Sequence, residues 1–152
     1  MAWHSNANTR KRGGDQAEKL FAKHVLCHCG SRFKFIGNRR KGFPDFTCEN
    51  CGQLVDVKSS PQAEQTGNIA ISAIPWSHYH DETLIAVFIH GEWIGQYKQF
   101  IYVPDPEPRK PTHDGRHSYL KNTDWHLISW KSFPKLSDLG YIVTATQKEQ
   151  SL

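Results

Sequence analysis

Hydrophobic and polar positions change their pattern several times along the chain, and the first pattern is helical. Apolar residues recur at spacings of three and four at Ala17, Leu20, Phe21 and Val25. This spacing predicts an amphipathic helix from Gly14 to about Val25, and Asp15 suits its positive N-terminal end. The first twelve residues are polar and basic and follow no period. We therefore expect a flexible basic arm over 1–12 and a single domain over 13–152.

Three short β-prone segments come next and are separated by Gly, Asn and Cys residues. They span 31–42, 42–49 and 53–60. This punctuation predicts an antiparallel β-meander. Ser60 and Pro61 then resemble a helix cap followed by a first helical turn, so we expect a helix within 61–80.

The second half of the chain begins with a nearly continuous apolar run at 83–91, which predicts a central buried strand. Residues 92–103 follow a tight connection and are expected to form its hairpin partner. The proline-rich stretch at 104–117 indicates a long surface loop. Towards the end of the chain the pattern predicts a strand at 124–130 and a short helix at 133–140.

The composition is that of a globular protein, with 38% hydrophobic and 22% charged residues. The charge is uneven, because residues 1–60 contain eleven Lys and Arg against five Asp and Glu, whereas the rest contains eight against ten. A positive field favours a polyanionic partner such as DNA, and a solvated surface is the alternative. No apolar run resembles a signal peptide or reaches the roughly 18 residues needed to cross a bilayer. We expect a cytoplasmic protein with no membrane partner.

The four cysteines lie within 25 residues of sequence, as Cys27-x-Cys29 and Cys48-x2-Cys51, and a glycine follows each pair directly. Two close thiolates on each of two turns supply the four soft ligands of tetrahedral zinc. Free buried thiols and redox chemistry are the alternatives. A zinc ion with four protein ligands has no open coordination position, so we expect this Zn²⁺ to be structural.

The first cysteine pair departs from the C-x2-C spacing that is usual in zinc ribbons. His24 and His28 lie close enough in the sequence to replace one thiolate, so a site with three cysteines and one histidine is an alternative to a four-cysteine site. The spacing of the remaining histidines matches neither an HNH-type site nor an H-E-x-x-H helix. We expect those histidines to be surface or hydrogen-bonded residues.

Two acids and a lysine flank the second cysteine pair. Asp45 lies eleven residues before Asp56, and a hairpin that turns at the cysteines places the two aspartates opposite each other. A period of two puts Lys58 on the same face as Asp56. Carboxylates on neighbouring strands form the hard oxygen site that Mg²⁺ prefers, and Lys58 is suited to orient an attacking water. A surface hairpin with a simple ion pair is the alternative.

These residues resemble the PD-(D/E)xK nuclease superfamily, whose Pro-Asp and Asp/Glu-x-Lys motifs lie on an α-β-β-β-α-β core. The matching residues are Pro44-Asp45 and Asp56-Val57-Lys58. The resemblance covers roughly residues 13–75. It implies an α/β, restriction-endonuclease-like fold with a mixed sheet flanked by helices, to which this chain adds a zinc-clamped β-meander.

The resemblance also implies roles for single residues. Asp45 and Asp56 would hold a catalytic Mg²⁺ ion and Lys58 would position water. Glu18, in the first helix, would be an additional catalytic acid. Some branches of the superfamily place a glutamine after the lysine, which leaves Gln62 and Gln65 as candidates.

A basic cluster lies between the first two expected strands. Arg39, Arg40 and Lys41 are candidates for contact with DNA phosphates, and a solvated loop is the alternative. The function expected from the resemblance is a metal-dependent endonuclease that hydrolyses DNA phosphodiester bonds, of a restriction, phage or junction-resolving type, and a homodimer is expected on the same ground. The alternative is a non-catalytic zinc-containing nucleic-acid-binding module.

Overall fold

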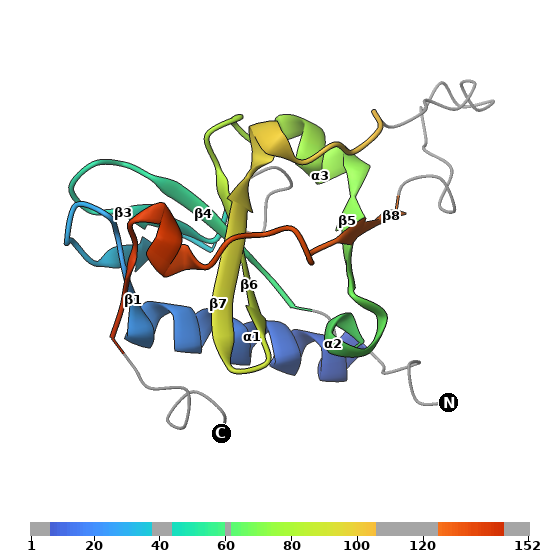
Figure 1. Cartoon of the computed structure of the whole chain (residues 1–152), viewed down its shortest axis with the longest axis horizontal. Coiled ribbons are helices and arrows are strands. Elements are labelled where there is room, and N and C mark those ends of the chain that lie inside the picture. The colour runs from blue at the N-terminus through green and yellow to red at the C-terminus, as the bar shows by residue number, and fades with distance from the viewer. Residues whose placement is uncertain (1–6, 38–43, 60–61, 106–124, 145–152) are drawn as a thin grey trace.

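The centre of the protein is a mixed five-stranded sheet in the order β2-β3-β4-β6-β7 (Figure 1). The strands are β2 Phe33–Phe35, β3 Phe46–Cys48, β4 Leu54–Lys58, β6 Leu84–Ile89 and β7 Glu92–Tyr97. The structure is a computed structural model that describes residues 7–37, 44–59, 62–105 and 125–144. It confirms the expected α/β class with a mixed sheet.

The strands β2, β3 and β4 form the expected antiparallel meander. Phe46 of β3 lies opposite Phe35 on one side and opposite Val55 on the other. The next strand in the sheet, β6, runs parallel to β4, with Ile85 opposite Asp56. Parallel neighbours need a crossover connection, and the chain between β4 and β6 supplies it.

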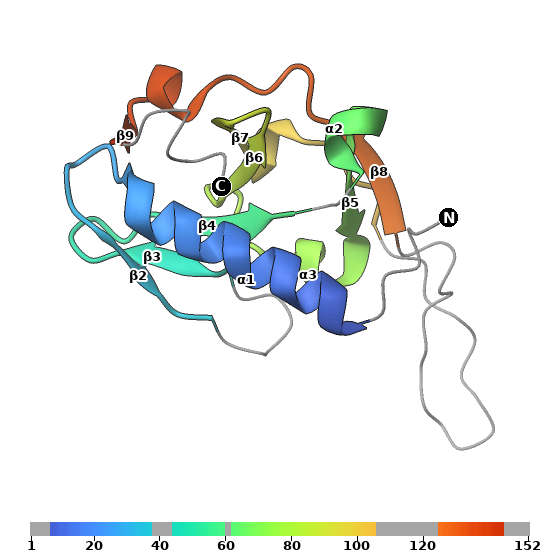
Figure 2. The same ribbon diagram turned by 90° about the horizontal axis from the view of Figure 1, so that it is seen from below.

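The helix α1 (Ala7–His24) covers one face of the sheet and runs alongside β3 and β4 (Figure 2). Phe21 is fully buried there, and its ring centroid lies 5.0 Å from that of Phe46 and 5.1 Å from that of Phe33. Val55 and Trp93 belong to the same buried cluster. The position of Phe21 on the helix therefore fixes α1 over the meander.

The strand β6 supplies both hydrophobic sides of the sheet, as a central strand should. Leu84 and Ala86 belong to the cluster beneath α1, whereas Ile85, Val87 and Ile89 belong to a second cluster on the opposite face. Successive side chains of a strand point to opposite faces, so the apolar run at 83–91 buries residues on both sides.

A helix and a two-stranded ribbon cover the second face. The helix α3 (Ala73–His78) contributes the buried Trp76 to this cluster. The ribbon pairs β5 (Asn68–Ser72) with β8 (Trp125–Ser129) in antiparallel register, and Ile69 and Ile71 of β5 are buried. The strand expected at 124–130 is therefore present as β8.

Two expected boundaries differ from the structure. α1 begins at Ala7 instead of Gly14, so residues 7–12, which were expected to belong to an irregular arm, have helical backbone. The region 61–80 contains two short helices, α2 (Ala63–Thr66) and α3, with the strand β5 between them. The strand was missed because the short Ile-Ala-Ile alternation at 69–71 lies between helix signals.

The C-terminal part of the chain returns to the first cysteines. The two-residue strand β9 (Ile142–Val143) pairs antiparallel with β1 (Val25–Leu26), and this pairing was not expected. The helix expected at 133–140 is a 3-10 helix, η2 (Leu136–Leu139), and its Leu136 is fully buried. The hairpin partner expected over 92–103 ends at Tyr97 and continues as η1 (Lys98–Phe100).

Candidate functional site

The first cysteine pair lies on a tight turn directly after β1. The backbone N–H of Cys27 donates to the carbonyl of Ser31 at 2.9 Å, and the N–H of Gly30 donates to the carbonyl of Cys27 at 2.8 Å. Gly30 has φ 89, a left-handed conformation that other residues rarely adopt. The turn therefore needs the glycine that follows the Cys-x-Cys motif.

The second pair lies on the turn between β3 and β4. The N–H of Gly52, which has φ 80, donates to the carbonyl of Cys48 at 3.1 Å. The backbone N–H groups of Asn50 and Cys51 both point at the sulfur of Cys48, at 3.4 Å. The two contacts therefore hold the Cys48 sulfur in a fixed position on the turn.

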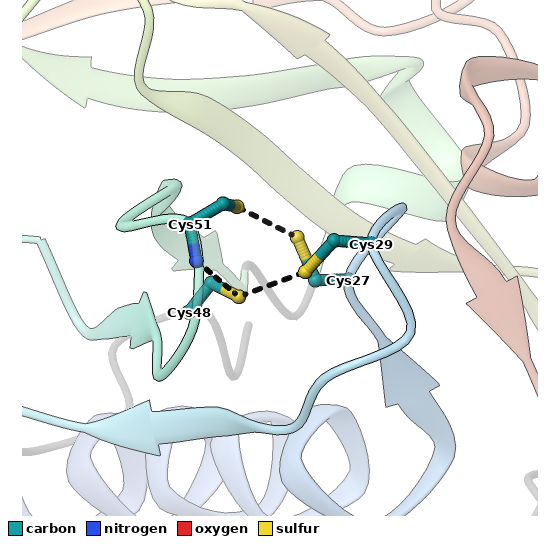
Figure 3. A group of neighbouring side chains, drawn as sticks. All are labelled: Cys27, Cys29, Cys48 and Cys51. Carbon is teal, nitrogen blue, oxygen red and sulfur yellow. Dashed lines mark hydrogen bonds between the residues drawn. The ribbon is translucent and has the colours of Figure 1, made fainter.

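The two turns bring all four sulfur atoms together (Figure 3). Cys27 Sγ lies 3.5 Å from Cys51 Sγ, and Cys29 Sγ lies 3.4 Å from Cys48 Sγ. All four sulfurs lie within 4.8 Å of one another. This is the donor set and the convergence that zinc requires, so the four cysteines can hold a metal such as zinc.

The thiols of this cluster differ in their protonation. Hydrogen bonds from the backbone of Ser31 and the side chain of Asn50 lower the pKa of Cys29 to about 5. Burial raises the pKa of Cys27. A bound metal ion would offset the cost of burying the Cys27 thiolate, because metal binding and thiol deprotonation are coupled.

The two histidines considered as ligands lie beside the cluster. His28 Nδ1 is 3.4 Å from Cys27 Sγ, but the group of metal-ligating atoms that the described residues bring within 4.8 Å contains the four cysteines and no histidine. His24 is buried at the end of α1, and its carbonyl accepts from the N–H of Thr144 at 2.8 Å. The geometry therefore favours four cysteine ligands over three cysteines and a histidine.

The two aspartates lie at the other end of the same hairpin. Phe46 pairs with Val55, and the same antiparallel register carried one residue further places Asp45 opposite Asp56. Asp45 Oδ2 accepts the N–H of Val57 at 2.8 Å. β3 begins at Phe46, so the carboxylate takes the place of a strand partner for this N–H. The hydrogen bond fixes Asp45 against β4.

Charge repulsion and burial act strongly on this pair. Burial, followed by the negative charge of Asp56, raises the pKa of Asp45 to about 8, and Glu18 adds a smaller effect in the same direction. The physical cause is that two neighbouring carboxylates shielded from water cannot both ionise at low cost. Asp56 itself is only 4% exposed. Such a pair favours a proton or a metal ion between its members.

Lys58 completes the arrangement on the same strand as Asp56. Its Nζ lies 2.9 Å from Asp56 Oδ2, and the side chain is 23% exposed, so solvent reaches the lysine far more than the carboxylate. A lysine two residues along a strand points to the same face, as the sequence predicted. The structure therefore brings the Asp-x-Lys motif and Asp45 together.

The other predicted site residues have different outcomes. Glu18 lies close enough to raise the pKa of Asp45, but among the described residues Glu18, Asp45 and Asp56 do not bring one carboxylate oxygen each within 4.8 Å of one another. Gln62 directly precedes α2, and Gln65 is exposed within it. Arg39, Arg40 and Lys41 lie outside the described residues.

Tyr79 is a member of this site that the sequence did not reveal. It follows α3 and is 9% exposed, and its ring centroid lies 5.8 Å from Lys58 Nζ. In the sequence, the surrounding segment "SHYHDE" stands out for its histidines and not for its tyrosine. The crossover between two parallel strands brings Tyr79 to the acids, and no local spacing records that packing.

Comparisons with known proteins leave the family open. No protein-family model matches this chain, and no curated protein matches it in sequence. In the part of the chain that the structure describes, no helix combines the length and the apolar character needed to span a membrane.

Proposed function

We propose that this protein is a metal-dependent endonuclease that hydrolyses phosphodiester bonds in DNA. The observation that carries the proposal is the convergence of Asp45, Asp56 and Lys58 at one end of the β3–β4 hairpin, with Lys58 Nζ 2.9 Å from the buried Asp56 carboxylate. A simple surface ion pair would stabilise the fold by only about 0–1 kcal/mol. Such an ion pair would not account for a second buried carboxylate, that of Asp45, beside the Asp56 carboxylate.

The chemistry of these side chains fits phosphodiester hydrolysis. Asp45 and Asp56 offer the hard oxygen ligands of Mg²⁺, which when bound would polarise a phosphate oxygen and offset its charge. Lys58 carries a positive charge that remains accessible to solvent, so it can hold an attacking water and stabilise the negative charge of the transition state. Glu18 adds negative charge near Asp45 and would assist in binding the cation.

The order of the elements supports the same proposal. Leaving aside the two-residue β1 and the ribbon strand β5, the elements from α1 to β6 run as a helix, the three antiparallel strands β2-β3-β4, the crossover helices α2 and α3, and the parallel strand β6. This order is compatible with the α-β-β-β-α-β core that the resemblance to the PD-(D/E)xK superfamily implies. The restriction-endonuclease-like topology is thus part of the proposal, together with the structural zinc that closes the hairpin.

Charge supports DNA as the substrate. Residues 1–60 contain eleven Lys and Arg against five Asp and Glu, and the proposed catalytic residues belong to this basic part of the chain. Positive charge near a phosphodiesterase site favours a polyanion and releases its counterions. Arg39, Arg40 and Lys41 would contribute phosphate contacts, and a homodimer would present two such sites to the two strands.

The test is cleavage of linear, circular and branched DNA by the purified protein in Mg²⁺, Mn²⁺ or EDTA. We expect cleavage in either metal, none in EDTA, and a loss of at least about a thousandfold in Asp56→Ala. Glu92→Ala is the control, because Glu92 also pairs with a lysine, at 3.4 Å, but lies on β7. Cleavage that survives in Asp56→Ala would overturn the mechanism. DNA binding without cleavage under any condition would favour the zinc-containing binding module instead.

A further inference from the structure

The four cysteines form two sulfur contacts, and each contact joins the two cysteine turns. The first turn carries Cys27 and Cys29, and the second carries Cys48 and Cys51. The sulfur of Cys29 lies 3.4 Å from that of Cys48, and the sulfur of Cys27 lies 3.5 Å from that of Cys51 (Figure 3). The sulfurs of each pair are in van der Waals contact but are not bonded. Both contacts therefore connect the first turn to the second.

Burial divides the members of each pair in the same way. Cys27 is 0% exposed and Cys48 is 3% exposed, whereas Cys29 and Cys51 are exposed. An oxidant attacks the sulfur that solvent reaches, and a neighbouring thiol can then complete a disulfide. Each pair therefore combines one accessible sulfur with one protected sulfur that already touches it.

A cleft gives small molecules a route to Cys51. It has a volume of about 540 Å³ and lies between the second cysteine turn and the segment before β6, where His80 and Glu82 line it. A water molecule occupies about 30 Å³ in the liquid, so the cleft has ample room for a peroxide. His28 of the first turn lines the same cleft. The cysteine cluster is therefore open to small oxidants on this side.

We propose that hydroperoxides oxidise the cysteine cluster to two disulfides that join the same two turns as the metal site. The disulfides are Cys29–Cys48 and Cys27–Cys51. A cysteine in a disulfide has no thiolate left to bind a metal ion, so oxidation releases zinc. The connection between the turns is kept, because covalent bonds take the place of the metal bonds. This modification goes beyond the proposed nuclease function and does not depend on it.

The same two chemical steps occur at each pair. The exposed thiolate attacks one oxygen of hydrogen peroxide, the O–O bond breaks, and a sulfenic acid forms while hydroxide leaves and takes up a proton to become water. The buried thiolate then attacks the sulfenic sulfur, the S–O bond breaks, and a second hydroxide leaves as water while the disulfide forms. Each pair loses two electrons, which one peroxide molecule accepts. A dithiol reductant reverses the modification by thiol–disulfide exchange.

The experiment treats the zinc-loaded protein with hydrogen peroxide, blocks the remaining thiols with iodoacetamide and maps the disulfides by mass spectrometry. Trypsin leaves the first two cysteines in the peptide 24–32 and the other two in the peptide 42–58. We expect these peptides to be linked, and fragmentation between Cys27 and Cys29 assigns the partner of each. Zinc release, followed with a metal-sensitive dye, should reach about one equivalent with about two equivalents of peroxide.

The oxidised protein should keep its fold without the metal. A strong chelator should lower the unfolding temperature of the reduced, zinc-loaded protein but leave that of the oxidised protein unchanged, because the disulfides then hold the turns. Protein oxidised in concentrated guanidinium chloride is the control. It should give a mixture of all the pairings that four cysteines allow, since an unfolded chain does not keep the sulfurs in fixed contacts.

Two matched variants separate the pairs, because each removes the exposed member of one pair. We expect Cys29→Ser to form the Cys27–Cys51 disulfide alone. Cys51→Ser should form the Cys29–Cys48 disulfide alone. In each variant the buried cysteine that has lost its partner should react with iodoacetamide instead. Where a variant does not fold, the disulfide map of the wild-type protein decides the question.

Three results would overturn the inference. They are disulfides within a turn, sulfinic or sulfonic acids in place of disulfides, and full retention of zinc in an excess of peroxide. Each of these results would leave the nuclease proposal intact, because that proposal is tested separately by DNA cleavage under reducing conditions.

Discussion

The two ends of the β3–β4 hairpin are built in different ways. At the turn, the four cysteines come from 25 residues of sequence, and backbone hydrogen bonds within each turn place them. At the open end, Asp45 and Asp56 share the hairpin, but Glu18 comes from α1 and Tyr79 from the crossover. The cysteine end depends on local geometry, whereas the acidic end depends on the packing of distant elements. Substitutions at the two ends should therefore have separable effects.

The largest effect is expected at the cysteine end. Cys48→Ser removes a buried thiol of the cysteine cluster whose sulfur also accepts two backbone N–H groups at 3.4 Å. Because the folding of a small metal site is coupled to metal binding, we expect zinc to be lost and the free energy of unfolding to fall by at least about 3 kcal/mol. Metal analysis and thermal unfolding by circular dichroism measure both quantities.

The wild-type protein treated with a strong chelator provides the control for Cys48→Ser. Chelated protein should unfold at the same lowered temperature and should recover when Zn²⁺ is added back, whereas Cys48→Ser should not recover. A variant that retains one equivalent of zinc and unfolds at the wild-type temperature would contradict the assignment of Cys48 as a ligand.

The next effect is confined to the acidic end. Lys58→Met should reduce DNA cleavage by about 10²–10³-fold, the usual cost of removing one group that stabilises transition-state charge. Zinc content should stay at the wild-type value, because the cysteine end does not depend on Lys58. The matched control is Lys135→Met, which removes another paired ammonium group, 3.4 Å from Glu92, and should leave cleavage unchanged. Equal activities of the two variants would contradict the role of Lys58.

A smaller effect is expected when Asp45 is replaced, and it concerns how the free energy of unfolding depends on pH. The pKa of Asp45 is raised to about 8 in the folded protein, whereas an aspartate in the unfolded chain has a pKa of about 4. Between these two pH values the folded state therefore holds a proton that the unfolded state has released. The charged carboxylate therefore destabilises the fold as the pH rises from about 4 to 8. In zinc-loaded, Mg²⁺-free protein at about pH 8.5, Asp45→Asn should be more stable than the wild type by about 1–3 kcal/mol.

The advantage of Asp45→Asn should shrink at about pH 5, where the wild-type carboxyl is protonated, and the amide oxygen of Asn can still accept the N–H of Val57. Urea unfolding at the two pH values measures the difference. A variant that is less stable than the wild type at the higher pH would show that burial and repulsion do not dominate at Asp45.

The smallest effect returns to the cysteine turn. Gly52 has φ 80, and an added Cβ would meet no atom within 4 Å, so only backbone strain opposes a side chain there. Gly52→Ala should cost about 1–2 kcal/mol and keep zinc bound. Gly52→Asn should cost less, since Asn tolerates the left-handed conformation. Thermal unfolding distinguishes the two variants, and an equal or larger loss for Asn would rule out backbone strain as the cause.

The sequence predicted the parts of the molecule that short-range spacing encodes. The cysteine pairs define the turn, and counting outward from that turn places Asp45 opposite Asp56 with Lys58 on the same face. The predictions from sequence missed features that depend on contacts between distant segments of the chain. β5 interrupts the expected helix because Ile69 and Ile71 pack in the same buried cluster as β6, and Tyr79 reaches the acids through a parallel pairing that leaves no local pattern.

The pairing of β1 with β9 has a consequence for how the chain folds during synthesis. Val143 lies opposite Val25, directly before the first cysteine turn, although most of the chain separates them in sequence. Contacts of such high sequence separation form late, and a chain leaving the ribosome completes residues 27–58 long before residue 143. We therefore expect the cysteine hairpin to be complete, and able to bind a metal such as zinc, while translation continues, with the pairing of β9 to β1 following later.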